Sequence, residues 1–449
     1  MINVGEKGKL RLYTRQLLGK GSIGHVFKGR YIWKQAVAVK RIRITKGEQN
    51  RILKIRTEVH VLERLVHENV IRYWISDSDD RYIYIAMDLC DGTLWDFNVQ
   101  STDNYKRVDI RKKLLNDIAL GLNYIHGKDI VHGDLTPQNV LLKTGPSSSK
   151  DLSFRAVISD YGLSLKHEEG LTVTRVTKQS PQKARGWKPK ELLTEEKVNP
   201  TKPADVFAFG CLVHFTLASN RGDKCIHPFG FPNFREENIR NDNRLYYLYS
   251  IKKKAHPLDD YLLADILIDL CVSTLPSEQL TTQEILDHPL FWSPDKKIKF
   301  TTTIVKLFNA KRLKFDNVPR LNELEENWKN LNLDTSNFIG RFLPRLWELC
   351  DNKPKDKSAD TLFFFMRLLR NITQHYADYE ETMEEFLGDG DTSTFVQYLF
   401  GGVPPAFPTI YLSFYPHCSP YTSLKEFFRE NMSSSKIEKS WDTMKKFTF

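Results

Sequence analysis

Two sets of residues in this sequence have the types and spacing that chemistry on phosphate groups requires. The first begins with a glycine-rich run at 19–26, where glycines let a backbone turn approach phosphate oxygens that a Cβ atom would exclude. Lys40 follows on a strand-like run, where its ammonium can pair with nucleotide phosphates, and Glu58 on the next predicted helix can orient it. The nucleotide-binding residues predicted from these runs are Gly19, Gly21, Gly24, Val26, Ala38, Lys40 and Glu58.

Three side chains farther along have the chemistry that phosphoryl transfer needs. Asp134 is predicted to accept the proton of an attacking hydroxyl. Asn139 and Asp160 offer the oxygen ligands that magnesium prefers, and we predict them as metal ligands. We therefore expect ATP or ADP, together with Mg²⁺, in this cleft.

The second set is Arg370, Asn371 and His375, which lie on one predicted helical stretch near the C-terminus. On a helix of about 3.6 residues per turn, Asn371 and His375 stand one turn apart and share a face, while Arg370 lies roughly 100° from Asn371. One phosphate group could span all three. The alternative is an ordinary buried helix, because 362–369 is apolar nearly all round.

The elements that must position these residues change in character along the chain. From 10 to 89, short β-branched and aromatic runs surround one helical segment at 51–65, which predicts a small β-rich lobe. Longer amphipathic helices dominate from 94 to 292. The predicted domains are 10–292, with a small lobe to about 90 and a large lobe from about 91, a helical domain at 293–430, and a polar, weakly patterned tail at 431–449.

Composition limits the remaining possibilities. A chain of 449 residues suits two or three domains, and its formal charge of +10 favours encounters with polyanions such as nucleic acid or anionic lipid. Six scattered cysteines form no CxxC pair, which argues against a zinc site and a disulfide framework and indicates a reducing compartment. The uncharged stretch 395–415 is broken by glycines and prolines, so we predict a buried helix, turn and helix there and no membrane span.

The order of the first set resembles that of the protein kinase family over roughly 10–292. His132 to Asn139, followed by Asp160-Tyr161-Gly162, resembles the family's catalytic loop and metal-binding segment, and 186–191 resembles the segment after the activation loop. The resemblance implies that Met87, Asp88 and Cys90 belong to the gatekeeper and adenine-binding hinge. It also implies that the run 205–210 forms the large buried helix of the fold.

Three departures from the kinase pattern bear on catalysis. Gly133 stands where kinases regulated by activation-loop phosphorylation carry an arginine. A phosphate on the activation loop of this chain would therefore lack that arginine as a partner. Thr136 replaces the lysine that follows the catalytic aspartate by two positions in Ser/Thr kinases, which removes a positive charge from the transferring phosphate. Gln279 stands where the family usually has an arginine. We therefore expect intact nucleotide binding with weak phosphotransfer.

The extension behind Trp292 resembles that of a smaller family, the inositol-requiring-enzyme stress sensors and ribonuclease L, in which the kinase domain continues into a helical kinase-extension nuclease. The run 368–375 is similar to the catalytic helix of that family. The resemblance implies that His375 acts as general acid, while Arg370 and Asn371 hold the scissile phosphate. Lys357 falls where the family usually has a tyrosine, so it could contact phosphate but would supply no phenol.

The chemistry of RNA explains why a few side chains suffice to cleave its backbone. The 2′-hydroxyl of RNA is its own nucleophile, so a protein need only move protons, neutralise the phosphate and hold the geometry. A histidine with an ordinary pKa of about 6.5 can protonate the departing 5′-oxygen at neutral pH. Such cleavage needs no metal and leaves a 2′,3′-cyclic phosphate.

The leading hypothesis is an α+β chain, with a bilobal protein-kinase-like domain followed by an all-α nuclease domain. It would act as a cytoplasmic, metal-independent endoribonuclease on RNA, activated when nucleotide favours a homodimer or higher oligomer. The resemblance leaves open that the chain is the cytosolic portion of a membrane-tethered protein. Two alternatives remain: a Ser/Thr kinase whose extension serves dimerisation or docking, and a scaffold without catalysis.

Overall fold

The structure is a computed structural model that describes most, but not all, of the chain. The described residues are 2–5, 8–20, 24–32, 34–44, 57, 59–60, 62–100, 108–144, 154–161, 186–194, 198–218, 227–251, 258–310, 362–374, 406–418, 421–429 and 432–448. Four predicted site residues, Gly21, Glu58, Lys357 and His375, lie outside them. The chain divides into two compact units, 1–245 and 246–449.

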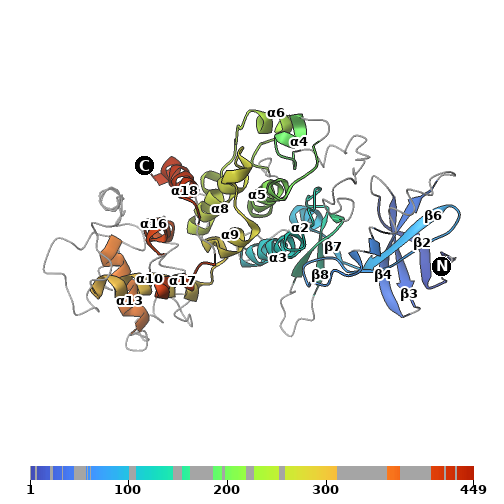
Figure 1. Ribbon diagram of the computed structural model, residues 1–449, viewed down its shortest axis with the longest axis horizontal. Coiled ribbons are helices and arrows are strands. Elements are labelled where there is room, and N and C mark those ends of the chain that lie inside the picture. Colours follow the sequence, from blue (N-terminus) through green and yellow to red (C-terminus); the bar gives the residue numbers. More distant parts are fainter. Residues whose placement is uncertain are drawn as a thin grey trace. The chain divides into compact units, whose positions relative to one another are not determined.

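The N-terminal part of the first unit is a six-stranded antiparallel sheet (Figure 1). Its strand order is β1-β2-β3-β4-β6-β5. The strands are β1 (Ile2–Val4), β2 (Leu10–Lys20), β3 (His25–Tyr31), β4 (Gln35–Arg43), β5 (Tyr73–Ser78) and β6 (Tyr82–Asp88). This sheet confirms the predicted β-rich lobe.

The two faces of this sheet have different roles. Because side chains alternate along a strand, Phe27, Val37 and Val39 point to one face and pack there with Leu10 and Leu12 in a buried core. The residues between them point to the opposite face, which carries Lys40. The hydrophobic core therefore holds the sheet from one side and leaves the other side available for a site.

The rest of the first unit is mainly helical. Its elements are β7 (Gly92–Thr93), α2 (Leu94–Gln100), α3 (Val108–His126), β8 (Val140–Thr144), β9 (Phe154–Ile158), α4 (Glu191–Thr194), α5 (Lys202–Ala218) and α6 (Arg235–Arg240). Strands β7, β8 and β9 form a second antiparallel sheet, and α3 packs against β9 and α5. Every residue of α5 from Ala204 to Ala218 is buried, as the predicted central helix requires.

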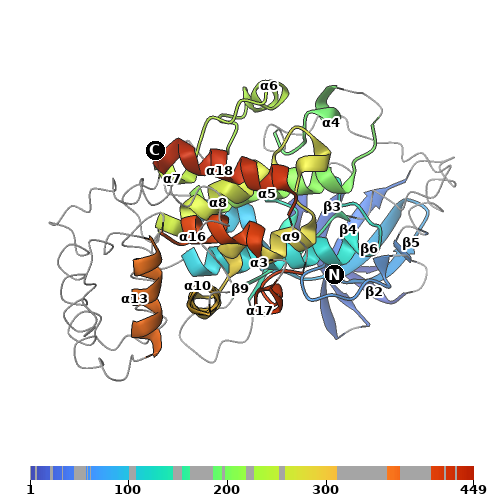
Figure 2. The same ribbon diagram turned by 60° about the vertical axis from the view of Figure 1, so that its left-hand side comes forward.

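The second unit is helical in its described residues. Its elements are α7 (Leu248–Ile251), α8 (Leu258–Cys271), η3 (Pro276–Glu278), α9 (Thr282–Asp287), η4 (Pro289–Phe291), α10 (Pro294–Asn309), α13 (Leu362–Gln374), α16 (Ala406–Phe414), η8 (Tyr415–His417), α17 (Thr422–Lys425) and α18 (Ser434–Thr448). Helices α8, α16 and α18 pack together, as Figure 2 shows. Residues 246–292 thus share a compact unit with the extension. The predicted domain boundary at 292 stays a prediction.

Trp292 stands at the centre of an aromatic cluster in this unit. Its ring centroid lies 5.3 Å from that of Phe300, 5.9 Å from Tyr411 and 5.6 Å from Phe427. Trp292 is only 3% exposed, and α16 is buried along its whole length. The predicted second helix of the stretch 395–415 is therefore present in the described residues.

The structure differs from the expected tail, because 434–448 forms helix α18. Its buried positions Lys436, Ser440, Trp441, Thr443 and Met444 recur at helical spacing. The buried face of α18 was not recognised in the sequence, because three of these five side chains are polar. Lys436 is paired with Glu284 of α9 at 2.7 Å, and Thr443 donates a hydrogen bond to Asp269 of α8 at 2.7 Å.

His288 gives this unit a defined response to acid. The side chain is 2% exposed, its Nδ1 accepts a hydrogen bond from the backbone N–H of Leu290, and burial lowers its pKa to about 3. At pH values between about 3 and 6.5, His288 is protonated in the unfolded chain and neutral in the folded chain. The free energy of unfolding therefore falls as pH falls through this range.

We expect acidification from pH 7 to pH 5 to cost the parent about 2 kcal/mol more than a His288→Asn variant, whose amide can accept the same bond without titrating. Chemical unfolding at both pH values measures this difference. His60→Asn, at an exposed position, is the matched control. Equal acid sensitivity of the parent and His288→Asn would contradict the assignment.

Candidate functional site

The register of the first sheet brings four predicted nucleotide-binding residues onto one face. Val26 pairs with Lys40 between β3 and β4, and Ala38 pairs with Met87 between β4 and β6. Directly paired residues point to the same face, and positions 38 and 40 of one strand do so as well. Val26, Ala38, Lys40 and Met87 therefore share the face opposite the core.

Lys40 forms a salt bridge with Asp160. Its Nζ lies 2.8 Å from Asp160 Oδ1, with the lysine side chain 8% exposed and the aspartate side chain 38% exposed. Burial works to raise the pKa of Asp160, but the charge and hydrogen bond of Lys40 outweigh it and hold the pKa below its ordinary value. The carboxylate is therefore ionised at neutral pH, as a metal ligand must be.

The glycine-rich run is described in part. Gly19 pairs with Val26 across β2 and β3, and a Cβ atom on Gly19 would meet nothing within 4 Å. At Gly24, by contrast, a Cβ atom would come within 2.4 Å of the backbone oxygen of Arg41. Gly24 is therefore required by the close approach of β4, and Gly19 leaves open space beside the predicted phosphate path.

The predicted hinge residues have different surroundings. Asp88 accepts a hydrogen bond from Trp74 Nε1 at 2.8 Å and forms an ion pair with Lys143, so its carboxylate holds the hinge to β5 and to β8. Cys90 is half-buried, and burial raises the pKa of its thiol to about 12. The thiol is thus protonated and unreactive at neutral pH.

A buried carboxylate holds the loop that carries Asp134. Asp205, at the start of α5 and 1% exposed, accepts hydrogen bonds from the backbone N–H of His132 at 2.7 Å and of Gly133 at 2.8 Å. His126 Nε2 lies 2.8 Å from the same carboxylate. The loop turns sharply at Gly133, where φ is +73°, a conformation that glycine adopts without strain.

Asp134 is positioned by its own neighbour in the loop. Asn139 Nδ2 donates to the backbone oxygen of Asp134 at 2.7 Å and to its Oδ2 at 3.1 Å. Asp134 is exposed, yet desolvation by the surrounding loops raises its pKa, while the charges of His132 and Lys188 act to lower it. A carboxylate so placed is suited to receive a proton from a bound hydroxyl.

The predicted metal ligands fit Mg²⁺ in kind. Because Asn139 donates through Nδ2, its amide oxygen remains as a possible metal ligand beside the ionised carboxylate of Asp160. Magnesium commonly takes one or two protein oxygens and completes its shell with water and substrate phosphates. Among the described residues, no cluster of three His, Cys, Asp or Glu side chains forms an alternative metal site.

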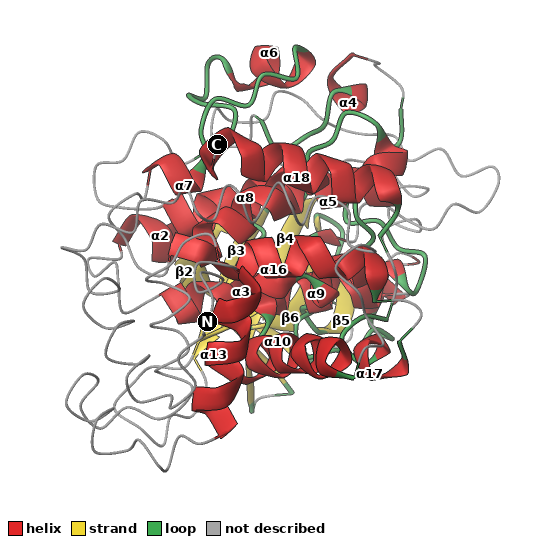
Figure 3. Cartoon of the chain, turned by 90° about the vertical axis from the view of Figure 1, so that its left-hand side faces the viewer, coloured by secondary structure: helices red, strands yellow, loops and turns green. Residues whose placement is uncertain are grey.

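The predicted RNA site is described at two of its residues, both on α13. This helix packs against α10 (Figure 3). Met366 and Leu369 are buried, while Arg367 and Gln374 are exposed. Arg370 and Asn371 are half-buried, at the edge between the packed face and solvent. The described side chains of this helix therefore lie partly in the packed interior and partly toward solvent.

Arg370 has a polar atom that the surrounding structure leaves unsatisfied. Its Nε is buried and has no hydrogen-bond partner among the residues that the structure describes. A buried guanidinium N–H without an acceptor is costly, and a phosphate oxygen is a strong acceptor for it.

Two contributors to the first site escaped prediction. The run containing Asp205 was recognised as a helix, but nothing in the sequence indicated that its carboxylate holds the catalytic loop 73 positions earlier. Lys188 was assigned no role, although it lines a pocket with Asp134. Both depend on contacts between segments far apart in sequence, and no local spacing encodes them.

These features define a protein kinase fold. A comparison with protein families finds the protein kinase domain over residues 12–291. The chain belongs to the protein kinase family.

The similarity to known proteins extends into the region behind that domain. The "Sensor for unfolded proteins in the ER ire1" of Schizosaccharomyces pombe is 31% identical over 416 residues, which cover 85% of this chain and 36% of that protein. The "Serine/threonine-protein kinase/endoribonuclease ire-1" of Caenorhabditis elegans is 28% identical over 438 residues, covering 94% and 41%. The "Probable serine/threonine-protein kinase irlD" of Dictyostelium discoideum is 28% identical over 439 residues, covering 86% and 27%.

The resemblance to the inositol-requiring-enzyme stress sensors is confirmed, since proteins of that name match most of the chain. The predicted α+β, kinase-like fold class is confirmed as well. The chain spans less than half the length of these relatives. No helix among the described residues combines the length and the hydrophobicity that a membrane span needs.

Proposed function

We propose that this chain is a metal-independent endoribonuclease whose kinase-like cleft binds ATP or ADP as a regulatory signal. The observation that carries the proposal is the pair Arg370 and Asn371, half-buried on an amphipathic helix of an extension whose relatives include a named kinase/endoribonuclease. The name of that relative describes that protein. It supports the proposal through the similarity of the two extensions.

The residues of α13 are assigned separate parts of the cleavage reaction. The guanidinium of Arg370 and the amide of Asn371 would grip the phosphodiester and balance its growing negative charge. The 2′-hydroxyl attacks the phosphorus, the bond to the 5′-oxygen breaks, and His375 supplies the proton that this oxygen takes up. Lys357 would contribute charge to the phosphate but no phenol.

The cleft would regulate cleavage through assembly. A nucleotide held by Lys40 and Asp160, with magnesium, would favour a homodimer if it binds the dimer more tightly than the monomer. A dimer would complete the RNA site from two copies. Mass action then makes the activity per protomer rise with protein concentration.

A second function is supported by the intact Lys40–Asp160 pair and by a relative named only as a probable kinase. In this alternative the chain is a Ser/Thr protein kinase, and its extension is a dimerisation or docking module. Peptide phosphorylation that disappears in Asp134→Asn, together with no RNA cleavage, would favour it.

The decisive experiment measures cleavage of end-labelled stem-loop RNAs by the parent chain in EDTA at high protein concentration. We expect cleavage to persist without metal and to leave a 2′,3′-cyclic phosphate, while DNA stem-loops of the same sequence stay intact for lack of a 2′-hydroxyl. Dependence on added Mg²⁺, or a 5′-phosphate at the cut, would refute the proposed chemistry.

A dilution series through the monomer–dimer transition tests the regulatory part of the proposal. We expect the rate per protomer to fall on dilution and to recover when ADP and Mg²⁺ are added, because ligand binding to one state stabilises that state. Light scattering on the same samples reports the assembly. A rate per protomer that stays constant across the transition would contradict the coupling.

A further inference from the structure

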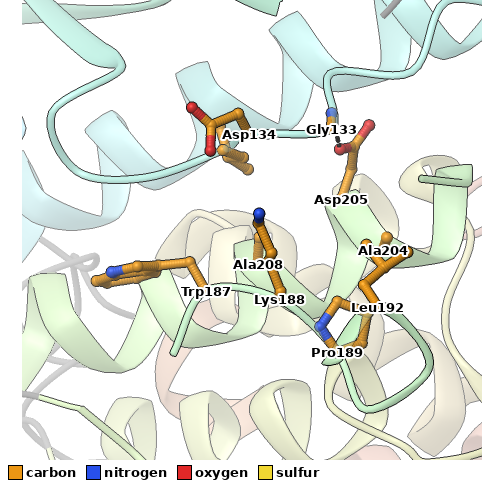
Figure 4. A pocket seen from close by; sticks show the side chains of 10 residues that line it. Gly133, Asp134, Trp187, Lys188, Pro189, Leu192, Ala204, Asp205 and Ala208 are labelled. Carbon is orange, nitrogen blue, oxygen red and sulfur yellow. Dashed lines mark hydrogen bonds between the residues drawn. The ribbon is translucent and has the colours of Figure 1, made fainter. Parts of the chain in front are cut away.

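A pocket beside Asp134 contains a positive charge that the kinase pattern does not place there. Its lining includes Asp134 and Gly133 from the catalytic loop, Trp187 and Lys188 from the segment before α4, and Asp205 from α5. Figure 4 shows the Lys188 side chain rising from its own segment toward the loop that carries Asp134. Of the residues that line this pocket, Lys188 is the one with a cationic side chain.

The two carboxylates of the pocket are not equivalent. Asp205 is 1% exposed, and its oxygens accept two backbone N–H bonds and face His126. Its charge is therefore already balanced within the loop. Asp134 is exposed, with Asn139 as its hydrogen-bond donor. We therefore expect the positive charge of Lys188 to act on a substrate that enters beside Asp134.

Thr136 cannot provide this charge. Its side chain is uncharged, and the residue is 5% exposed, within the loop that carries Asp134. A cation close to Asp134 must therefore come from another segment, and Lys188 is half-buried at the wall of the same pocket.

We infer that the ammonium of Lys188 contacts the phosphate under transfer at Asp134, and so supplies the positive charge that Thr136 lacks. In the step, a serine or threonine hydroxyl oxygen bonds to the γ-phosphorus of ATP and the bond to the β–γ bridging oxygen breaks. ADP departs with the bonding electrons, and the hydroxyl proton passes to Asp134. Negative charge that shifts among the phosphate oxygens is balanced by Lys188.

This inference goes beyond the proposed nuclease and does not depend on it. It replaces the expectation that the loss of a lysine at position 136 weakens phosphotransfer with the proposal that Lys188 supplies the same charge from another segment. A cation supplied from a different part of the chain can act equally well if its end reaches the same phosphate.

The test is a peptide phosphorylation assay with the full chain and its Lys188→Met variant. We expect the variant to lower kcat by about 10²-fold or more with little change in the KM for ATP, since the charge acts on the transferring group. Lys188→Arg, which keeps the charge, should lose less than tenfold. Lys190→Met, at an exposed position outside the pocket, is the matched control.

A second variant places a lysine in the loop that carries Asp134. Thr136→Lys placed in the Lys188→Met background should recover at least tenfold of the lost rate, whereas a merely structural role of Lys188 predicts no recovery. Thermal unfolding of each variant identifies a folding defect.

A binding measurement provides a readout that does not require turnover. Aluminium fluoride with ADP and Mg²⁺ mimics the phosphate in transfer, so Lys188→Met should weaken binding of that complex at least tenfold and leave ADP affinity unchanged. Calorimetric titration measures both. Equal losses for both ligands would indicate a general defect and overturn the inference.

The outcomes separate this inference from the nuclease proposal. A parent chain without phosphotransfer, or a Lys188→Met variant as active as the parent, would overturn the role of Lys188 even if RNA is cleaved. Absence of RNA cleavage with normal phosphotransfer would leave Lys188 supported and refute the nuclease.

Discussion

Replacing His375 by alanine should lower the rate of RNA cleavage by about 10²- to 10⁴-fold, the usual contribution of a positioned proton donor. The 5′-oxygen would then leave without a proton, which is the most difficult part of the reaction at neutral pH. RNA affinity should change little, because the phosphate would still be held by Arg370 and Asn371. Single-turnover cleavage and filter binding on the same RNA measure the two effects separately.

Arg370→Ala should show a different pattern, with loss of both affinity and rate, because its half-buried guanidinium has a donor available for phosphate. Arg370→Lys should recover little, since an ammonium cannot reproduce the paired bonds of the guanidinium plane. Arg367→Ala, on the exposed side of the same helix, is the matched control for charge. Cleavage indifferent to both His375→Ala and Arg370→Ala would remove the nuclease assignment.

Replacing Asp205 by asparagine should destabilise the first unit by roughly 3–5 kcal/mol, the range for breaking a buried, hydrogen-bonded charged group. One of its two acceptor oxygens becomes an amide that faces donors, so either His132 N–H or Gly133 N–H loses its partner. The catalytic loop would then lose its turn, and phosphotransfer at Asp134 should fall with it. Fluorescence of the buried Trp187 during urea unfolding reports the change in this unit.

Asp129→Asn supplies the control for that substitution. Asp129 pairs with Lys202 at 2.8 Å, but its side chain is 83% exposed, so the pair contributes less than about 1 kcal/mol. Asparagine also tolerates the positive φ of +56° at this position. Equal destabilisation by the two substitutions would show that Asp205 does not hold the loop.

Strand alternation explains how residues chosen by motif spacing can come to share one face of the sheet. Val26, Ala38 and Lys40 were placed by motif spacing, and the register of β3, β4 and β6 brings them together with Met87. Asp88 shows the limit of that reasoning. Motif position placed it at the hinge, but only the structure shows that Trp74 and Lys143 hold its carboxylate.

Contacts between distant segments were beyond prediction for a physical reason. In the sequence, a buried lysine such as Lys436 looks like an exposed one until its partner Glu284, 152 positions earlier, is known. The same applies to Lys188 and Asp134, which spacing alone does not relate. At α13, residue types and spacing predicted a helix, and the structure shows in addition that Arg370 and Asn371 are half-buried on it. The nuclease roles of His375 and Lys357 stay predictions.

The aromatic cluster around Trp292 has a practical consequence for protein production. Phe300, Phe407 and Phe427, which surround that indole, all follow it in the chain, and Lys436 neutralises the buried Glu284 from α18. A recombinant fragment that stops at residue 292 would expose the hydrophobic surface around Trp292 to solvent. It would also leave Glu284 without its partner Lys436. Such a fragment should accumulate as inclusion bodies, so expression vectors for the kinase domain are best designed to retain the C-terminal helices.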